Sequence, residues 1–346
     1  MRNQIGAAMG AAMQRTAGRI RGGIWEGKAV CQPHILTSRN ATRPPVHFEV
    51  LHEIFEAQAD WQPDAVAVLF GREKTTYAQL EQRANRLAHY LRAQGVGCGW
   101  LVALLLPRSV DAYVSMLGIL KAGAACVPIH PAYPLERVAR ILEDSDARAL
   151  VTTAALSKSC GDTVLFSGVV VRVDTDVAAI GTQSCERVPR TEISAFARDL
   201  CYVNYACDET RSPNRVVIEH RDACKRVCAE GEIFKVQPGD RVYHGLSHPF
   251  DTSVEEAWLA FHAGATLVVL PPDLTHASPD LSRTLKDAGV TVLSCKPILL
   301  STLKEDVPTV RLLILGGSAC PDHLAEHWAR PGRRMVNTCG LTEDAS

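Results

Sequence analysis

Short apolar segments alternate with amphipathic segments along most of the chain, and no other feature restricts the fold as much. Residues 101–106 and 125–129 are continuous apolar runs, and residues 111–122 between them have helical periodicity. Residues 241–337 repeat this alternation. Strands buried on both faces, with helices between them, build parallel sheets that are covered by helices. The sequence therefore predicts an α/β fold.

The 346 residues are enough for two lobes and a leader. The first 45 residues are rich in arginine and glycine and only weakly apolar, which favours a disordered leader over a targeting segment. The alternation weakens over residues 153–199, and we place a boundary at the end of that stretch. The expected organisation is a leader over 1–45, a first α/β lobe over 46–198 and a second α/β lobe over 199–346.

The composition argues against several classes of protein. A net charge of −1 shows no basic excess, so no nucleic-acid partner is expected. The longest apolar run, near residues 100–106, is too short to span a bilayer, so no membrane partner is expected either. Twelve cysteines occur without a Cys-x-x-Cys pair, which favours a reduced, cytoplasmic protein over a disulfide framework.

Five segments carry a more specific pattern. They are TTYAQL (75–80), LKAGAACVPIHPAYPLER (120–137), the frame of 202–221, FDTS (250–253) and NTCGLTE (337–343). In this order and spacing they resemble the core motifs of the adenylate-forming, or AMP-binding, enzymes. The resemblance is greatest to the amino-acid adenylation domains of non-ribosomal peptide synthetases, and it covers the chain from about residue 51 onwards.

Three further segments refine the resemblance. GDRVY (239–243), SVEEAW (253–258) and WARPGRR (328–334) are similar to the poly-amino-acid synthetase type, which includes the ε-poly-lysine synthetases. The resemblance therefore implies a function in non-ribosomal peptide or poly-amino-acid synthesis. Family members use ATP and Mg²⁺ to convert an amino acid into an aminoacyl-AMP.

The implied fold is the two-lobed N-terminal core of these enzymes. In the family, a small barrel and a mobile C-terminal domain with a catalytic lysine follow this core. The sequence ends three residues after Glu343, so we expect a truncated core that lacks most of the barrel and the whole C-terminal domain. The implied partners are an amino-acid substrate and a carrier or C-terminal domain on a separate chain.

The resemblance also assigns roles to individual residues. Thr342 and Glu343 match the catalytic pair, in which the hydroxyl contacts phosphate and the carboxylate holds Mg²⁺. Asp251 matches the anchor of the substrate α-amino group. The residues assigned to ATP are Thr210, Gly316, Gly317, Asn337 and Gly340. The residues assigned to the amino-acid substrate are Asp251, Glu255, Ser294, Ile314 and Thr338.

Several of these residues have a structural alternative. Asp251 precedes a predicted helix and is also suited to cap it. The Gly316–Gly317 pair also fits a plain tight turn. Glu255 favours a basic amino acid, such as lysine or ornithine, if it faces the pocket, and is only a charge in the first turn of a helix if it faces solvent.

Histidine and cysteine residues leave two further alternatives open. His244 and His248 flank a predicted strand end near FDTS, where they either line the pocket or face solvent. His220, Cys224 and Cys228 are spaced four apart. On one helix face they are either zinc ligands or the buried side of an amphipathic helix, and the missing Cys-x-x-Cys pair favours the helix.

The phosphate-binding loop departs from the family pattern. No glycine remains over residues 206–215, Asn214 stands at the position of the family's lysine, and Asp208 and Glu209 add two negative charges. Each carboxylate about 4 Å from a phosphate costs roughly 1 kcal/mol in water and about 4 kcal/mol at an intermediate dielectric. Cys339 also replaces the aromatic residue that stacks on adenine. We therefore expect weakened binding of ATP and Mg²⁺.

Two functional hypotheses follow. In the first, the chain is a truncated amino-acid adenylation core with impaired activity. In the second, it is a non-catalytic pseudo-enzyme that binds an amino acid or a partner, or a decayed gene product.

Overall fold

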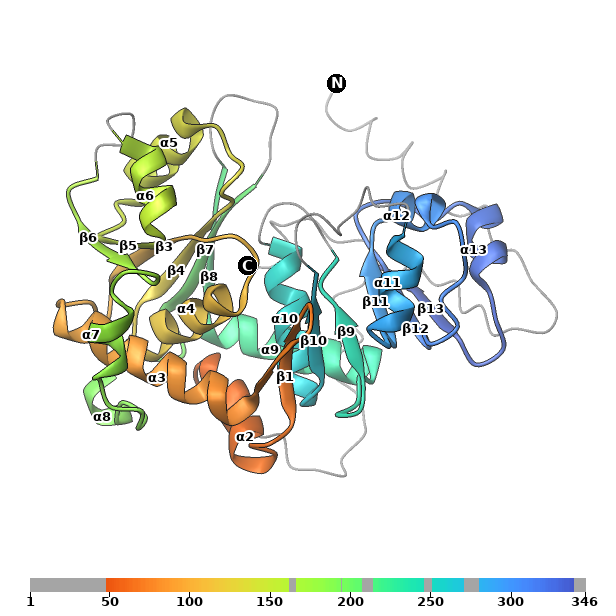
Figure 1. The fold of residues 1–346 in the computed structure, drawn as a ribbon, viewed down its shortest axis with the longest axis horizontal. Coiled ribbons are helices and arrows are strands. Elements are labelled where there is room, and N and C mark those ends of the chain that lie inside the picture. The colour runs from red at the N-terminus through yellow and green to blue at the C-terminus, as the bar shows by residue number, and fades with distance from the viewer. Residues whose placement is uncertain are drawn as a thin grey trace, which may run out of the picture.

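The structure is a computed structural model in which two β-sheets, each flanked by helices, lie side by side (Figure 1). It describes residues 48–161, 166–193, 195–206, 214–245, 251–270 and 280–338. Parallel pairing dominates both sheets, and a single antiparallel pair is found at one end of each. The prediction of two parallel-sheet α/β lobes is confirmed.

The first sheet has six strands in the order β6-β5-β3-β4-β7-β8. Its strands are β3 (Leu101–Leu105), β4 (Ala125–Ile129), β5 (Ala149–Thr152), β6 (Val169–Arg172), β7 (Leu200–Ala206) and β8 (Asn214–Glu219). The second sheet has seven strands in the order β13-β12-β11-β9-β10-β1-β2. Its strands are β1 (Val66–Phe70), β2 (Glu73–Thr76), β9 (Arg241–Tyr243), β10 (Thr266–Val269), β11 (Val292–Cys295), β12 (Leu312–Leu315) and β13 (Arg334–Asn337).

Helices connect most of the strands and cover the sheets (Figure 1). Those in the first half of the chain are α2 (His52–Trp61), α3 (Tyr77–Ala93), α4 (Val110–Lys121), α5 (Leu135–Ser145), α6 (Ala154–Cys160), α7 (Val177–Gly181) and α8 (Arg190–Ile193). Those in the second half are α9 (His220–Phe234), α10 (Asp251–Ala263), α11 (Leu281–Asp287), α12 (Pro297–Thr302) and α13 (Asp322–Trp328). No helix in the described ranges is long and apolar enough to cross a membrane.

Strand pairing crosses the boundary expected between residues 198 and 199. β1 and β2 precede it, yet β1 pairs with β10 in the second sheet, with Val68 opposite Leu267. β7 follows the boundary, yet it pairs with β4 in the first sheet, with Cys126 opposite Tyr202. Strands pair through backbone hydrogen bonds with segments that are distant in sequence. The alternation of apolar and amphipathic segments does not reveal which segments pair.

One hydrophobic core joins the two sheets. It contains Val102 and Leu104 from the first sheet and Val242 and Leu312 from the second. Helices α2, α3, α4 and α10 contribute the layer between them. The ring of Phe55 lies 5.0 Å from that of Phe261, so α2 and α10 are in direct contact. The two lobes therefore share their packing, and a change at this layer affects both.

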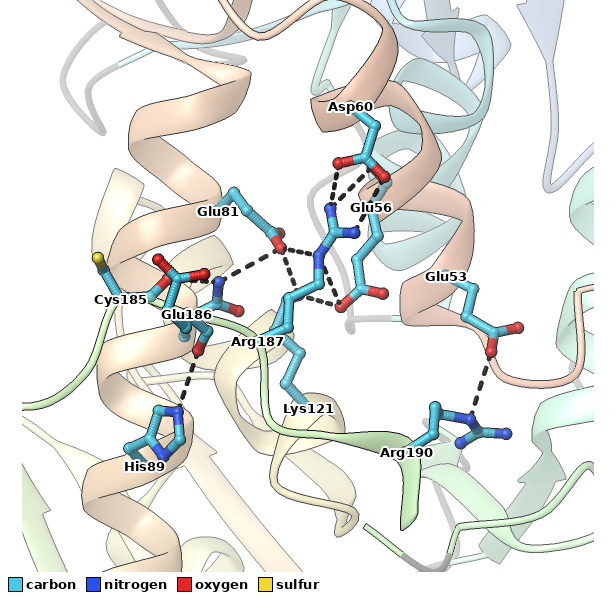
Figure 2. A network of polar contacts seen from close by, with 11 residues as sticks. Glu53, Glu56, Asp60, Glu81, His89, Lys121, Cys185, Glu186, Arg187 and Arg190 are labelled. Atoms are coloured by element: carbon cyan, nitrogen blue, oxygen red, sulfur yellow. Dashed lines mark hydrogen bonds and ion pairs between the residues drawn. The ribbon is translucent and has the colours of Figure 1, made fainter. Parts of the chain in front are cut away.

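A buried ion-pair network holds a long connection against this layer (Figure 2). Lys121, at the end of α4, is paired with Glu56 of α2 and lies 2.9 Å from the Glu81 carboxylate of α3. Arg187 donates from Nε to Glu81 at 2.7 Å and from Nη2 to Asp60 at 2.8 Å. These contacts fix the chain between α7 and α8 onto helices α2 and α3.

Candidate active site

The carboxyl ends of β11, β12 and β13 meet at one edge of the second sheet. The three strands are parallel, with Ser294 opposite Ile314 and Ile314 opposite Val336. Residues opposite one another in a parallel pair point to the same face. Ser294 and Ile314, both assigned to the amino-acid substrate, therefore lie next to each other, and each is only 6% exposed.

Gly316 and Thr338 complete this edge from neighbouring strands. The Thr338 amide donates to the Leu315 carbonyl at 2.7 Å, and its hydroxyl donates to the same oxygen at 3.1 Å. A Cβ added to Gly316 would lie 3.2 Å from the Thr338 hydroxyl oxygen. The structure thus brings together four residues predicted to bind ligands: Ser294, Ile314, Gly316 and Thr338.

Gly317 turns the chain away from the strand with a φ of +79°, a conformation that favours glycine. This geometry fits both the tight turn and the predicted passage over adenine. Carbon atoms of the Lys296 side chain lie 3.5 Å or more from the position of an added Cβ at Gly317. Lys296 is an exposed cation that directly follows β11 at the same edge, and the sequence motifs did not indicate it.

Asn337 ends β13 beside the same carbonyl. With its amide nitrogen directed toward Leu315, the side chain donates to the Leu315 carbonyl at 3.1 Å and accepts from the Cys320 amide at 3.2 Å. This orientation satisfies both side-chain atoms. The amide nitrogen has a second hydrogen and the amide oxygen a second lone pair, so Asn337 keeps these two bonds while it retains the capacity to bond a ligand.

Helix α10 begins at Asp251, so this residue is the first of the helix and does not precede it as the capping interpretation expected. Glu255 lies one turn later in the same helix. The side chains of residues 251–255 are outside the described part of the structure, so both interpretations of both residues stay predictions. Also outside the described residues are Thr210, Gly340, Thr342, Glu343 and His248.

His244 directly follows β9 and is buried, with 4% exposure, so this histidine does not face solvent. Its Nδ1 atom lies 3.2 Å from the Tyr113 hydroxyl of α4 and 3.9 Å from the Glu256 carboxylate of α10. The Arg108 guanidinium donates to the His244 carbonyl at 3.0 Å. Burial, with a smaller contribution from Arg108, lowers the pKa of His244 well below its usual value, so its ring is neutral at pH 7.

Helix α9 carries His220, Cys224 and Cys228, and the contacts of this helix bear on the two interpretations of their spacing. His220 and Cys224 are buried, and the Leu51 amide donates to His220 Nδ1 at 3.0 Å. Burial raises the pKa of the Cys224 thiol to about 12. Within the described ranges no group of three or more His, Cys, Asp or Glu residues is arranged to hold a metal ion. This face of α9 packs as part of the core.

Comparisons with known proteins identify the family. The family model described as "AMP-binding enzyme" matches residues 55–346, which is most of the chain. The chain belongs to the AMP-binding enzymes. A linear gramicidin synthase from Brevibacillus parabrevis is 38% identical over 294 residues, which cover 85% of this chain and 6% of that protein. Delta-poly-L-ornithine synthetase of Acinetobacter baumannii is 34% identical over 299 residues, which cover 85% of this chain and 22% of that protein.

A solved structure agrees with these sequence relatives. The non-ribosomal peptide synthetase FmoA3, in its alpha-methyl-L-serine-AMP-bound form, matches with a TM-score of 0.78 and 33% identity. The match covers 88% of this chain and 34% of that one. This chain thus resembles the adenylation portion of much longer AMP-binding synthetases, and it spans only a small part of their length. Both the peptide-synthetase and the poly-amino-acid type are among the relatives.

Proposed function

We propose that this AMP-binding chain binds an amino acid at the carboxyl edge of its second sheet and forms the aminoacyl adenylate poorly. The observation that carries the proposal is the convergence of Ser294, Ile314, Gly316 and Thr338 at that edge. Ligands of open α/β sheets bind outside the carboxyl ends of the strands. The solved relative with a bound aminoacyl-AMP supports a ligand of the same class.

The reaction is the attack of an amino-acid carboxylate oxygen on the α-phosphorus of ATP. The new C–O–P linkage is a mixed carboxylic–phosphoric anhydride, and pyrophosphate leaves with the electron pair of the broken phosphoanhydride bond. Two anionic groups must meet, so the protein contributes mainly by positioning them and by placing donors near the developing charge. When bound, Mg²⁺ supplies charge neutralisation on the phosphates, and Glu343 is the residue proposed to hold it.

Several described residues support a nucleotide site at this edge. Gly316 and Gly317 lack side chains where the backbone passes the ends of β11 and β13, so a flat ring could approach the peptide groups. Thr338 and Asn337 add a hydroxyl and an amide at the same level. The phosphate-binding side depends on Thr210 and Thr342, for which the proposal rests on sequence alone.

The amino-acid side of the site is proposed to be acidic. Asp251 would pair with the substrate ammonium group, because a carboxylate and an ammonium group form a charge-assisted hydrogen bond. Glu255, one turn further along α10, would favour a basic side chain. We expect L-lysine or L-ornithine to bind more tightly than L-leucine, measured by isothermal titration calorimetry. Equal affinities for lysine and leucine would contradict the role of Glu255.

A single substitution tests the role of Asp251. Asp251→Asn removes the charge that would pair with the ammonium group, so amino-acid affinity should fall by about 10-fold to 100-fold, given the 1.5–3 kcal/mol typical of a charged hydrogen bond. Asp280→Asn, which lies just before α11, is the matched control and should leave the affinity unchanged. An unchanged affinity in Asp251→Asn would leave only the capping role.

The altered phosphate-binding loop supports the proposal that the chain forms the aminoacyl adenylate poorly. Asp208 and Glu209 would repel the phosphates, and Asn214 provides no cation. We expect weak amino-acid-dependent exchange of labelled pyrophosphate into ATP, and stronger exchange in Asn214→Lys. Strong exchange by the unmodified chain would contradict impairment. Amino-acid binding without exchange in either protein would favour the non-catalytic alternative, and absence of both would contradict the proposed function.

A further inference from the structure

Ser294 and Ile314, both predicted to bind the amino-acid substrate, lie in one row of residues across the second sheet. This row extends beyond Ser294. In the second sheet, Leu293 is opposite Tyr243 of β9. Continuing this register by one residue places His244 opposite Ser294, which in turn is opposite Ile314. The His244 amide also donates to the Val268 carbonyl of β10 at 2.9 Å, so the residue keeps the geometry of the strand. His244, Ser294 and Ile314 therefore form one row on one face of the sheet.

Three side chains converge on His244 at this end of β9. Tyr113 of α4 contacts the ring of His244, with ring centroids 5.8 Å apart and a hydrogen bond of 3.2 Å to Nδ1. Glu256 of α10 lies 3.9 Å from the same nitrogen. Arg108, which precedes α4, donates to the His244 carbonyl. The contacts of Tyr113 and Arg108 belong to the first lobe, whereas His244 and Glu256 belong to the second.

Gly245, the residue after His244, shows how closely the chain packs against Ser294 at this point. A Cβ added to Gly245 would lie 2.5 Å from the Tyr243 ring and 3.0 Å from the Ser294 carbonyl oxygen. The chain thus passes Ser294 with no room for a side chain. Glu256 is five residues after Asp251 in α10, so a shift at His244 is transmitted to the part of the helix that carries the proposed amino-acid anchor.

We propose that His244, bonded to Tyr113, is a positioning residue that sets the amino-acid pocket by fixing both the Ser294 row and the first turns of α10. The inference rests on the proposed function, because it assigns the pocket to amino-acid binding. His244 acts through Ser294 and Glu256 and takes no part in bond making. Its ring is neutral, and burial raises the pKa of Tyr113, so the hydroxyl keeps its proton and can donate to Nδ1.

The test compares four variants of the full chain. Tyr113→Phe deletes one hydroxyl, and His244→Leu deletes the bonding ring while keeping an apolar side chain. His244→Asn restores a polar atom near the position of Nδ1. Tyr77→Phe is the matched control, because the Tyr77 hydroxyl is also fully buried and donates to the Ala265 carbonyl at 2.8 Å, away from His244. All four remove or replace a buried hydrogen-bonding group.

Hydrogen exchange tests the positioning without any ligand. Amides of residues 255–259, which bond within α10, should exchange at least 5-fold to 10-fold faster in Tyr113→Phe and in His244→Leu. They should exchange at the unmodified rate in His244→Asn and Tyr77→Phe. Equal rates in all five proteins would overturn the inference, whatever the chain binds.

Titration with L-lysine, and with L-leucine if lysine does not bind, then tests the pocket. Tyr113→Phe should weaken binding about 5-fold to 10-fold, as expected for one hydrogen bond of about 1–1.4 kcal/mol, and His244→Leu should weaken it further. Affinity in Tyr77→Phe should stay within twofold, despite a similar loss of thermal stability. If the unmodified chain binds and Tyr113→Phe binds equally well, the inference fails while the proposed function stands. If neither amino acid binds to the unmodified chain, the proposed function fails, and the exchange rates still decide the role of His244.

Discussion

At the scale of single residues, Arg333 shows how a buried charge is accommodated in this fold. Its side chain is only 2% exposed. The guanidinium donates to the carbonyls of Val310, Trp328 and Val307 and to the carboxylate of Asp306, at 2.8–3.1 Å. Four acceptors in different directions match the planar fork of arginine, which a lysine ammonium cannot reproduce.

Arg333→Lys should therefore be costly although it keeps the charge. We expect a loss of about 2–4 kcal/mol in the free energy of unfolding, since at least two bonds to a charged donor are lost in a buried place. Urea unfolding of the full chain gives the value. Arg330→Lys, whose side chain is 46% exposed, should lose less than about 1 kcal/mol. Equal losses in the two variants would show that burial of the Arg333 guanidinium does not add to the free energy of unfolding.

The sequence indicated residues 328–334 as a motif but did not indicate which arginine is buried. Arg330, Arg333 and Arg334 have the same chemistry and lie within five residues. The turn at Gly332, with a φ of +81°, directs only Arg333 beneath the loop before β12. That distinction depends on the path of the chain, so composition and spacing could not predict it.

At the scale of elements, the ion-pair network of Figure 2 links three helices with one long connection. Lys121 is 2% exposed, and its charge is balanced by Glu56 and Glu81. Arg187 shares both carboxylates but is 37% exposed. The buried lysine is therefore the centre of the network, and Arg187 is its partly solvated edge.

Lys121→Met should destabilise the chain strongly. It leaves the buried Glu81 and the partly buried Glu56 with one partner fewer, and removing one member of a buried pair typically costs about 3–5 kcal/mol. Arg187→Met should lose only about 1 kcal/mol, because solvent screens its contacts. Thermal and urea unfolding compare the two variants. A larger loss in Arg187→Met than in Lys121→Met would reverse this order and contradict the network as described.

The segments expected over residues 101–106, 111–122 and 125–129 lie within one residue of β3, α4 and β4. Strands such as β3 and β12 are continuous apolar runs, and α3 has a clear apolar face with a capping box at Thr76 and Gln79. Apolar periodicity does not predict β2, because its residues, Glu73–Thr76, are polar. It is a strand only because it pairs with β1 at the end of the second sheet.

At the scale of the whole molecule, buried histidines lie where α2 and α9 meet at the core shared by both lobes. His52 and His220 are each 1% exposed, with ring centroids 6.2 Å apart. Burial lowers the pKa of His220 to about 4 and lowers that of His52 well below its usual value. Asp199 opposes the shift of His220, and Lys121 adds to that of His52.

Stability should consequently fall as the pH is lowered from about 6.5 toward 4. In this range the unfolded chain binds protons at these histidines and the folded chain does not, so each one lowers the free energy of unfolding by about 1.4 kcal/mol per pH unit. Urea unfolding between pH 7.5 and pH 4.5 measures the slope. His220→Asn, which offers an oxygen to the Leu51 amide, should reduce the slope by the contribution of one histidine. An unchanged slope in His220→Asn would contradict the assignment.

The sequence alone determined the fold class, the family and the positions of several elements. Apolar periodicity and the order of motifs along the chain can both be read without knowing which segments meet in space. The family resemblance predicts that Ser294, Ile314, Gly316 and Thr338 bind ligands. The structure places these residues at one edge of the second sheet, and their binding roles stay predictions. Only the tertiary structure decided that β1 and β7 cross the expected lobe boundary and that His244 continues the Ser294 row. Such facts depend on pairing and burial between distant segments, which local pattern does not encode.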